Sequence, residues 1–158
     1  MIIAPLIWWI APRLLPFGFN LILVALGGLV VGDSLKDLLH IPRPSHPQLW
    51  RYSHSASTSH EYGMPSTHAM NAVSNSLIFL MCSGGECGAE VGYGSLGMSE
   101  QATAYMATAW IVSICASRLY LGVHTLDDVA MGSGLGLMVA RVWLLMLNAK
   151  IGRASCSA

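Results

Sequence analysis

His124 and Asp128 carry the clearest chemical pattern in this sequence. They are four residues apart, which brings an imidazole and a carboxylate together across one helical turn. A carboxylate that holds one ring nitrogen fixes the tautomer and leaves the other nitrogen free to act as a nucleophile. The same residues also fit a capping box, with Thr125 at the N-cap and Asp128 at N3, beside an interfacial histidine. Asp127 has the wrong angular position to hold His124, although it too could act as a cap.

A second histidine follows a turn sequence, in the stretch Pro65-Ser66-Thr67-His68. Ser66 is a favourable N-cap for a helix that begins near His68. The start of a helix presents free backbone N–H groups and a positive dipole end, which favour an anion, and His68 there could donate a proton. The alternative is an ordinary capped helix with a solvent-facing histidine.

Three cations are candidates for binding an anion. Lys36 and Arg43 are seven residues apart, about two helical turns, so on one helix they would face the same side. Arg118 precedes the segment that carries the first histidine pattern. Arginine offers a planar fork that matches phosphate oxygens, and lysine offers a point charge. The alternative is that these cations snorkel at helix ends or pair with Asp33 and Asp37.

The elements that must position these residues are apolar. Of 158 residues, 54% are hydrophobic and 10% are charged, with a mean hydropathy of +0.56, whereas soluble domains carry about 25% charged residues. We expect one domain, residues 1–158, folded as an all-α, multi-pass transmembrane bundle that carries the chemical residues at one membrane face. About four hydrophobic segments are expected, over residues 14–32, 69–82, 102–116 and 129–147.

The N-terminal region is expected to be interrupted. Residues 2–11 are apolar but too short to cross a bilayer, and a break is expected at Pro12, Arg13 and Pro16. A short helical extension is expected over 33–39. The small residues near 132–136 favour close helix packing, and the polar residues within 69–82 suit a helix surrounded by others.

Counting crossings places all three chemical clusters on the same side of the membrane. The other side holds Arg13, Lys150 and Arg153, which weakly favours the cytoplasm for that side. The cations on the side of the clusters, Lys36, Arg43, Arg51 and Arg118, favour the opposite orientation, but we discount them because three of them are candidates for binding an anion. The segment 45–62, with three histidines, is expected to be a solvated loop rather than a metal site.

Net charge and cysteine usage exclude some classes of partner. The formal net charge is zero and no basic stripe is present, so no nucleic-acid partner is expected. Cys82, Cys87, Cys115 and Cys156 have no zinc-binding spacing. We interpret them as free, inert thiols, with a disulfide between Cys82 and Cys87 as the alternative.

Taken together, three cations and two histidines on one membrane face predict a site for a phosphate monoester. Cations and helix-end N–H groups neutralise the equatorial oxygens, and positioning does most of the work, without a metal ion.

The three clusters resemble the three-part signature of the type-2 phosphatidic acid phosphatase superfamily, across residues 36 to 128. The first part is Lys, six residues, Arg-Pro; the second is Pro-Ser-Gly-His; the third is Ser-Arg, five residues, His, three residues, Asp. The residues that match are Lys36, Arg43, Pro44, Pro65, Ser66, His68, Ser117, Arg118, His124 and Asp128. The second part departs at Thr67, which stands where the family commonly has glycine.

Within that superfamily, Thr67 and its context are most similar to the sphingosine-1-phosphate phosphatases. The resemblance implies hydrolysis of sphingoid base phosphates through a phosphohistidine on His124, without a metal or cofactor. It implies that Asp128 orients His124 and that His68 protonates the leaving alcohol and then activates water. It further implies an active site that faces the lumen of the endoplasmic reticulum. The implied phosphate-binding residues are Lys36, Arg43, Ser66, Thr67 and Arg118.

Members of the family have more membrane helices than this chain, so a truncated or minimal homologue is expected. Two alternatives stay open. One keeps the site but hydrolyses phosphatidate or an isoprenoid diphosphate. The other is a non-catalytic membrane fragment that binds a phospholipid headgroup or a partner protein. The sequence gives no prediction for the oligomeric state.

Overall fold

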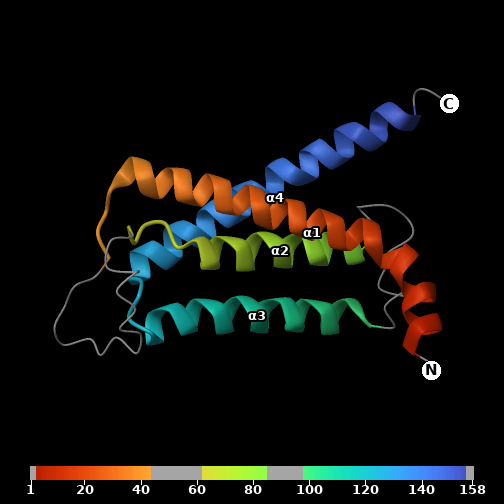
Figure 1. The fold of residues 1–158 in the computed structure, drawn as a ribbon, viewed down its shortest axis with the longest axis horizontal. Helices are drawn as coiled ribbons and strands as arrows, with labels where there is room; N and C mark the ends of the chain where they lie inside the picture. Colours follow the sequence, from red (N-terminus) through yellow and green to blue (C-terminus); the bar gives the residue numbers. More distant parts are fainter. Residues whose placement is uncertain (1–2, 44–61, 85–97, 156–158) are drawn as a thin grey trace.

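The computed structural model describes residues 3–43, 62–84 and 98–155, and within these ranges the chain forms four helices, with an isolated β-bridge between Pro42 and Tyr62. The helices are α1 (Ile3–Leu39), α2 (Thr67–Ser83), α3 (Glu100–Tyr120) and α4 (Leu126–Ser155). Consecutive helices run in opposite directions (Figure 1). The expected all-α class is therefore confirmed. Most of the expected loop over 45–62, including His46, His54 and His60, lies outside the described residues.

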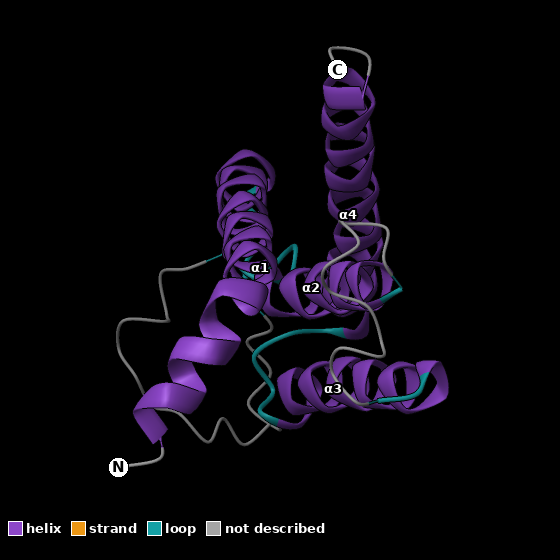
Figure 2. Cartoon of the chain, turned by 90° about the vertical axis from the view of Figure 1, so that its right-hand side faces the viewer, coloured by secondary structure: helices purple, strands orange, loops and turns teal. Residues whose placement is uncertain are grey.

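Helix α2 is the centre of the fold. It contacts α1, α3 and α4, and it lies between α3 and the other two helices in both views (Figures 1 and 2). Its bounds agree with the segment expected over 69–82. Ser74 and Ser76 are buried on it, as expected for a helix whose polar groups face other helices rather than lipid.

Helix α1 corrects the expected interruption near the N-terminus. Pro12 and Pro16 lie inside a continuous helix of 37 residues, where a break was expected. Figure 1 shows that α1 changes direction near its N-terminal end. A proline inside a helix removes one hydrogen bond and clashes with the carbonyl four residues back, which bends a helix without necessarily ending it. The prediction of a break was therefore wrong.

Two glycines let α4 approach the backbone of α2. A Cβ added to Gly132 would meet the carbonyl oxygen of Ser66, and one added to Gly136 would meet the carbonyl oxygen of Met70. These are backbone atoms that cannot turn aside. The expected role of residues 132–136 in close packing is thus confirmed, with the one-turn spacing that suits such contacts.

Helix α1 also approaches α2 closely at two glycines, although here the nearest atoms belong to side chains. A Cβ on Gly28 would meet the side-chain oxygen of Asn71, and one on Gly32 would meet the methyl group of Thr67. Helix α2 is therefore held between two glycine pairs, each spaced by four residues.

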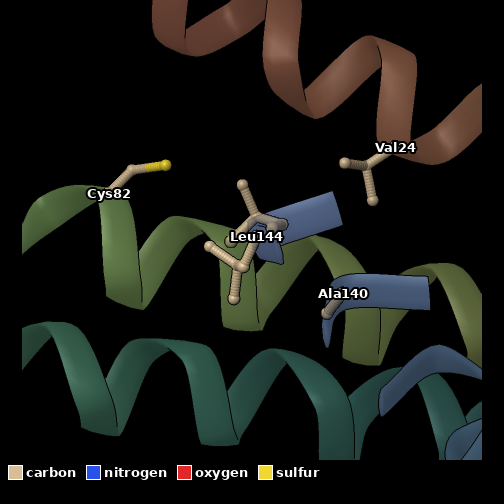
Figure 3. Packing of buried hydrophobic residues seen from close by; sticks show 5 residues of the cluster. Val24, Cys82, Ala140 and Leu144 are labelled. Atoms are coloured by element: carbon tan, nitrogen blue, oxygen red, sulfur yellow. The ribbon is translucent and has the colours of Figure 1, made fainter. Parts of the chain in front are cut away.

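The arrangement of polar and apolar groups suits a membrane. A small apolar cluster lies between α1, α2 and α4 and includes Val24, Cys82, Ala140 and Leu144 (Figure 3). Many large apolar side chains point outward instead; they include Phe19, Ile22, Val30, Trp110, Val112, Met138 and Leu145. Two helical stretches, Gly18–Leu39 and Leu126–Ala149, are long and apolar enough to cross a bilayer.

The cysteines differ from one another. Cys115 is free, as expected. Cys82 is disulfide-bonded, so the prediction of a free thiol was wrong there. Cys87 and Cys156 lie outside the described residues.

Candidate active site

The structure brings the three predicted clusters together at one end of the bundle. The end of α1, the start of α2, the end of α3 and the start of α4 all lie at the left of Figure 1. The positive charges of Arg118, Lys36 and Arg43 all act on His68, and those of Arg43 and Lys36 act on His124. Residues far apart in the sequence therefore share one electrostatic environment.

Ser66 joins two of the clusters. Its side-chain oxygen accepts a hydrogen bond from the backbone N–H of Ala69 at 3.5 Å, which confirms the predicted cap of α2. Its own backbone N–H donates to the backbone carbonyl of Asp128 at 3.1 Å. The turn that begins α2 is thus tied to the first turn of α4. Sequence reasoning missed this second bond, because a backbone partner leaves no mark on residue type.

Lys36 reaches the start of α2 from the last turn of α1. Its ammonium group lies 3.3 Å from the hydroxyl oxygen of Thr67 and 3.0 Å from a carboxylate oxygen of Asp33. The Lys36 side chain is 16% exposed. The alternative that Lys36 pairs with Asp33 is therefore confirmed, and it coexists with the placement of Lys36 at the predicted phosphate site.

Arg43 arrives by a route that the sequence did not predict. It does not share a helix with Lys36, because His40 adopts a left-handed backbone with φ of 51° as α1 ends. The chain then pairs Pro42 with Tyr62 in an antiparallel bridge. The two-turn spacing argument for Arg43 was therefore wrong in its geometry, although the positive charge of Arg43 still acts on both histidines.

Arg118 lies in the last turn of α3. Its Nε donates to the hydroxyl of Ser117 at 3.3 Å. The helix extends to Tyr120, four residues further than expected. The chain then turns at Gly122, whose φ of 63° is favourable for glycine, so the predicted bend is confirmed.

His124 and Asp128 realise both alternatives at once. The backbone N–H of Thr125 donates to Oδ2 of Asp128 at 2.7 Å, and the backbone N–H of Asp128 donates to the Thr125 hydroxyl at 3.2 Å, which is a capping box. The same Oδ2 lies 3.7 Å from Nδ1 of His124. That distance is too long for a hydrogen bond, and the two groups form an ion pair only when the imidazole is protonated. Both side chains are buried.

The environment keeps His124 neutral. Burial lowers its pKa to about 4, helped by the positive charges of Arg43 and Lys36. The carboxylate of Asp128 and a backbone hydrogen bond with Gly63 oppose this effect and raise the pKa. The imidazole is therefore uncharged near pH 7, which is the form that can act as a nucleophile.

His68 is exposed, in the first turn of α2. Its pKa is lowered by partial burial of the ring and then by the charges of Arg118, Lys36 and Arg43. An anion bound among those cations would offset their charge, and it would favour the protonated imidazole that a general acid requires.

A cavity begins at His68 and follows α2 along the bundle. It measures about 230 Å³ and is lined by Leu29, Thr67, His68, Asn71, Ala72, Asn75, Trp110 and Ile114. A second cavity, of about 280 Å³, shares Asn75 and Trp110 with the first and extends to Leu21 and Phe79. Sequence reasoning did not locate this path; Asn71 and Asn75, polar and four residues apart in an apolar run, were the available signal.

The sequence profile described as the PAP2 superfamily matches residues 14–151. A dihydrosphingosine 1-phosphate phosphatase of Schizosaccharomyces pombe is 31% identical over 115 residues, covering 72% of this chain and 26% of the relative. Sphingosine-1-phosphate phosphatase 2 of Mus musculus is 33% identical over 125 residues, covering 79% of this chain and 31% of the relative.

A relative with a broader name is also similar. Lipid phosphate phosphatase delta of Arabidopsis thaliana is 30% identical over 119 residues, covering 72% of this chain and 27% of the relative. The chain thus spans about a quarter to a third of the length of these relatives. No solved structure gives a significant match.

Proposed function

Because this chain belongs to the PAP2 superfamily, we propose that it is an integral-membrane phosphatase that hydrolyses the phosphate monoester of long-chain sphingoid bases. The observation that carries the proposal is the convergence of His124, Asp128 and His68 with three cations at the end of an apolar bundle. The names of the curated relatives support the substrate class, since several are phosphatases of sphingosine 1-phosphate or dihydrosphingosine 1-phosphate.

In the first step, neutral His124 attacks phosphorus. Asp128 lies beside Nδ1, so Nε2 is the nitrogen left to form the N–P bond. The bond between phosphorus and the lipid oxygen breaks, and His68 gives its proton to that oxygen. The products are the free lipid alcohol and a phosphohistidine, whose positive ring charge is balanced by Asp128.

In the second step, a water molecule replaces the alcohol. His68, now neutral, takes a proton from this water as its oxygen attacks phosphorus. The N–P bond breaks, inorganic phosphate leaves, and both histidines return to their starting states.

The cations supply the electrostatic part of catalysis. Lys36, Arg43 and Arg118 neutralise the non-bridging oxygens, with Ser66 and the backbone at Thr67 contributing hydrogen-bond donors at the positive end of α2. Lys36, Arg118 and Ser66 are placed by helix ends, and Arg43 follows Pro42 in the bridge with Tyr62. These placements exist before substrate arrives, so little reorganisation is needed.

The membrane setting follows from the same arrangement. The lipid chain enters the cavity that starts at His68, while the phosphate stays at the end of the bundle. We place the protein in the endoplasmic reticulum with this end facing the lumen. Arg13, Lys150 and Arg153 support a cytoplasmic position for the opposite end once the cations assigned to phosphate binding are left out of the comparison.

The test is phosphate release by the purified chain in detergent or lipid nanodiscs. Sphingosine 1-phosphate is compared with phosphatidate and an isoprenoid diphosphate, and the wild type with His124→Ala. We expect the wild type to prefer sphingosine 1-phosphate and the variant to lose at least about a thousandfold in rate, because no nucleophile remains. Full activity in a folded His124→Ala variant would contradict the proposed mechanism. Preference for another substrate would reassign the lipid.

A further inference from the structure

Asp33 is a charged residue at the site to which the proposed chemistry gives no role. Its side chain is 61% exposed, and one carboxylate oxygen lies 3.0 Å from the ammonium group of Lys36. A negative charge beside a phosphate site repels the phosphate unless it binds something cationic on the same ligand. The ion pair with Lys36 uses Oδ1 of Asp33, so the other carboxylate oxygen can accept from a cationic group of the ligand.

The position of Asp33 is fixed by its neighbours on α1. Leu29, Asp33 and Lys36 are separated by four and three residues, so they form one stripe along the helix. Leu29 lines the cavity, and Lys36 contacts Thr67 at the start of α2. Asp33 thus stands on the stripe between the lining of the cavity and the phosphate site. With a rise of about 1.5 Å per residue, Asp33 lies about 4.5 Å further than Lys36 from the site end of α1, measured along the helix axis.

A sphingoid base phosphate carries a cation at a matching depth. Its ammonium group is on the carbon next to the one that bears the phosphate, on the side of the alkyl chain. Resting on the function proposed above, we infer that Asp33 binds this ammonium group and selects lipid phosphates with an amine beside the phosphate. Phosphatidate has an ester in place of the amine at that carbon, and an alkyl phosphate has neither group there.

The existing contacts leave room for this interaction. An ammonium group has three donors and a carboxylate has two oxygens. Lys36 can keep Thr67 and Asp33 while its third hydrogen turns to the phosphate. Asp33 can keep Lys36 on Oδ1 and accept from the substrate on its other oxygen. A phosphate without an amine meets the same carboxylate without compensation, so Asp33 both favours one class and disfavours the other.

The experiment compares two ligands of similar chain length, sphingosine 1-phosphate and octadecyl phosphate, which lacks the amine. The ratio of kcat/KM values is measured for the wild type and Asp33→Asn. We expect the preference for sphingosine 1-phosphate to fall by roughly tenfold in Asp33→Asn, the size expected for losing one charge-assisted hydrogen bond. Asp33→Glu, which keeps the charge, should retain part of the preference.

Asp127→Asn is the matched control. Asp127 is exposed at the same end of the bundle, in the first turn of α4, and the variant removes the same charge. Its preference should equal that of the wild type. An unchanged preference in Asp33→Asn would overturn the inference. An equal fall for both ligands would also overturn it, because Asp33 would then act only by positioning Lys36.

The same comparison by direct binding separates this inference from the proposed function. Dissociation constants for both ligands are measured in the His124→Ala background, with and without Asp33→Asn. If Asp33 governs the binding preference while the wild type releases no phosphate, the ammonium site stands and the phosphatase proposal fails. If phosphate is released but neither preference depends on Asp33, the phosphatase proposal stands and the ammonium site is wrong.

Discussion

His124 and Asp128 illustrate how one residue serves two purposes at this site. The carboxylate of Asp128 closes the capping box at 2.7 Å and approaches His124 at 3.7 Å through the same oxygen. Because the cap fixes the carboxylate, the histidine receives a partner whose position is set by the helix itself. The sequence offered these readings as alternatives, since spacing alone cannot say that a single oxygen satisfies both.

The pH dependence belongs to the residue scale. His124 acts as a nucleophile in its neutral form, and its pKa is about 4, so its contribution is lost only as pH falls through about 4. His68 acts first as an acid, and its pKa is lowered from 6.5, so its contribution is lost as pH rises through a value below 6.5. We expect a bell-shaped profile of kcat/KM with an acidic optimum.

The acidic limb of that profile is the informative part. The second ionisation of a phosphate monoester is near pH 6, so a limb near pH 4 reports the enzyme rather than the substrate. Rates of phosphate release from pH 3.5 to 9 would measure it, after confirming that the protein stays folded at each pH. A profile that rises steadily to pH 9 would contradict these roles for the two histidines.

At the scale of elements, the contact between α2 and α4 sets the relation between the two histidines. Gly132 lies against the backbone of Ser66, two residues before His68, and Ser66 is also bonded to the backbone of Asp128. The separation of these helix starts is therefore controlled by the absence of a side chain. The small residues at 132–136 predicted close packing, but the sequence did not identify which helix they contact.

Gly132→Ala should lower the rate of phosphate release strongly while the protein remains folded. Its Cβ would meet the Ser66 carbonyl oxygen, so α2 and α4 must separate at the site. A displacement of about 1 Å at reacting groups can cost on the order of a hundredfold in rate. Phosphate release and the thermal unfolding midpoint in detergent measure the two effects.

Gly134→Ala is the matched control, because a Cβ there has nothing within 4 Å. It should leave the rate unchanged and stabilise the helix by up to about 1 kcal/mol, since alanine loses less conformational entropy than glycine. Equal rates for Gly132→Ala and Gly134→Ala would show that the close approach of α2 and α4 does not position the site.

Helix boundaries mark where sequence reasoning succeeded and where it failed. The start of α2 was predictable because Ser66 is a local cap, and the turn at Gly122 was predictable because glycine tolerates a positive φ. The continuity of α1 through Pro12 was not predictable, because the low helix propensity of proline is compatible both with a bend in a helix and with the end of one. The route of Arg43 depended on a pairing with Tyr62, which is remote in sequence.

At the scale of the whole molecule, the convergence of four helix ends could be predicted from counting crossings alone. The site is therefore assembled by the topology of the chain, because consecutive helices run in opposite directions and each cluster lies at a helix end on the same face. The cavity along α2 could not be predicted in this way, because its volume depends on how Leu29 and Trp110 pack around the central helix. The ion pair of Asp33 with Lys36 was only one of several alternatives until both were placed.

Metal independence is a prediction for the whole molecule. We expect phosphate release to persist in excess EDTA, because Lys36, Arg43 and Arg118 supply the positive charge that bound metal ions supply in other phosphoryl-transfer sites. A magnesium-dependent phosphatase assayed in parallel should lose its activity. Strict dependence on added magnesium would count against the assignment of these three residues.

The hydrogen bond between the Ser66 N–H and the Asp128 carbonyl has a consequence for how such a site can vary. Neither atom belongs to a side chain, so ordinary substitutions at these two positions leave both partners in place. Most single replacements at these positions would therefore leave this hydrogen bond intact, and a mutational scan would not detect it. Proline at position 66 would break it, because proline has no backbone N–H to donate. The relative position of His68 and His124 is thus set by backbone geometry. Residues around the site can therefore change, and with them the lipid that is bound, while the two histidines keep their alignment.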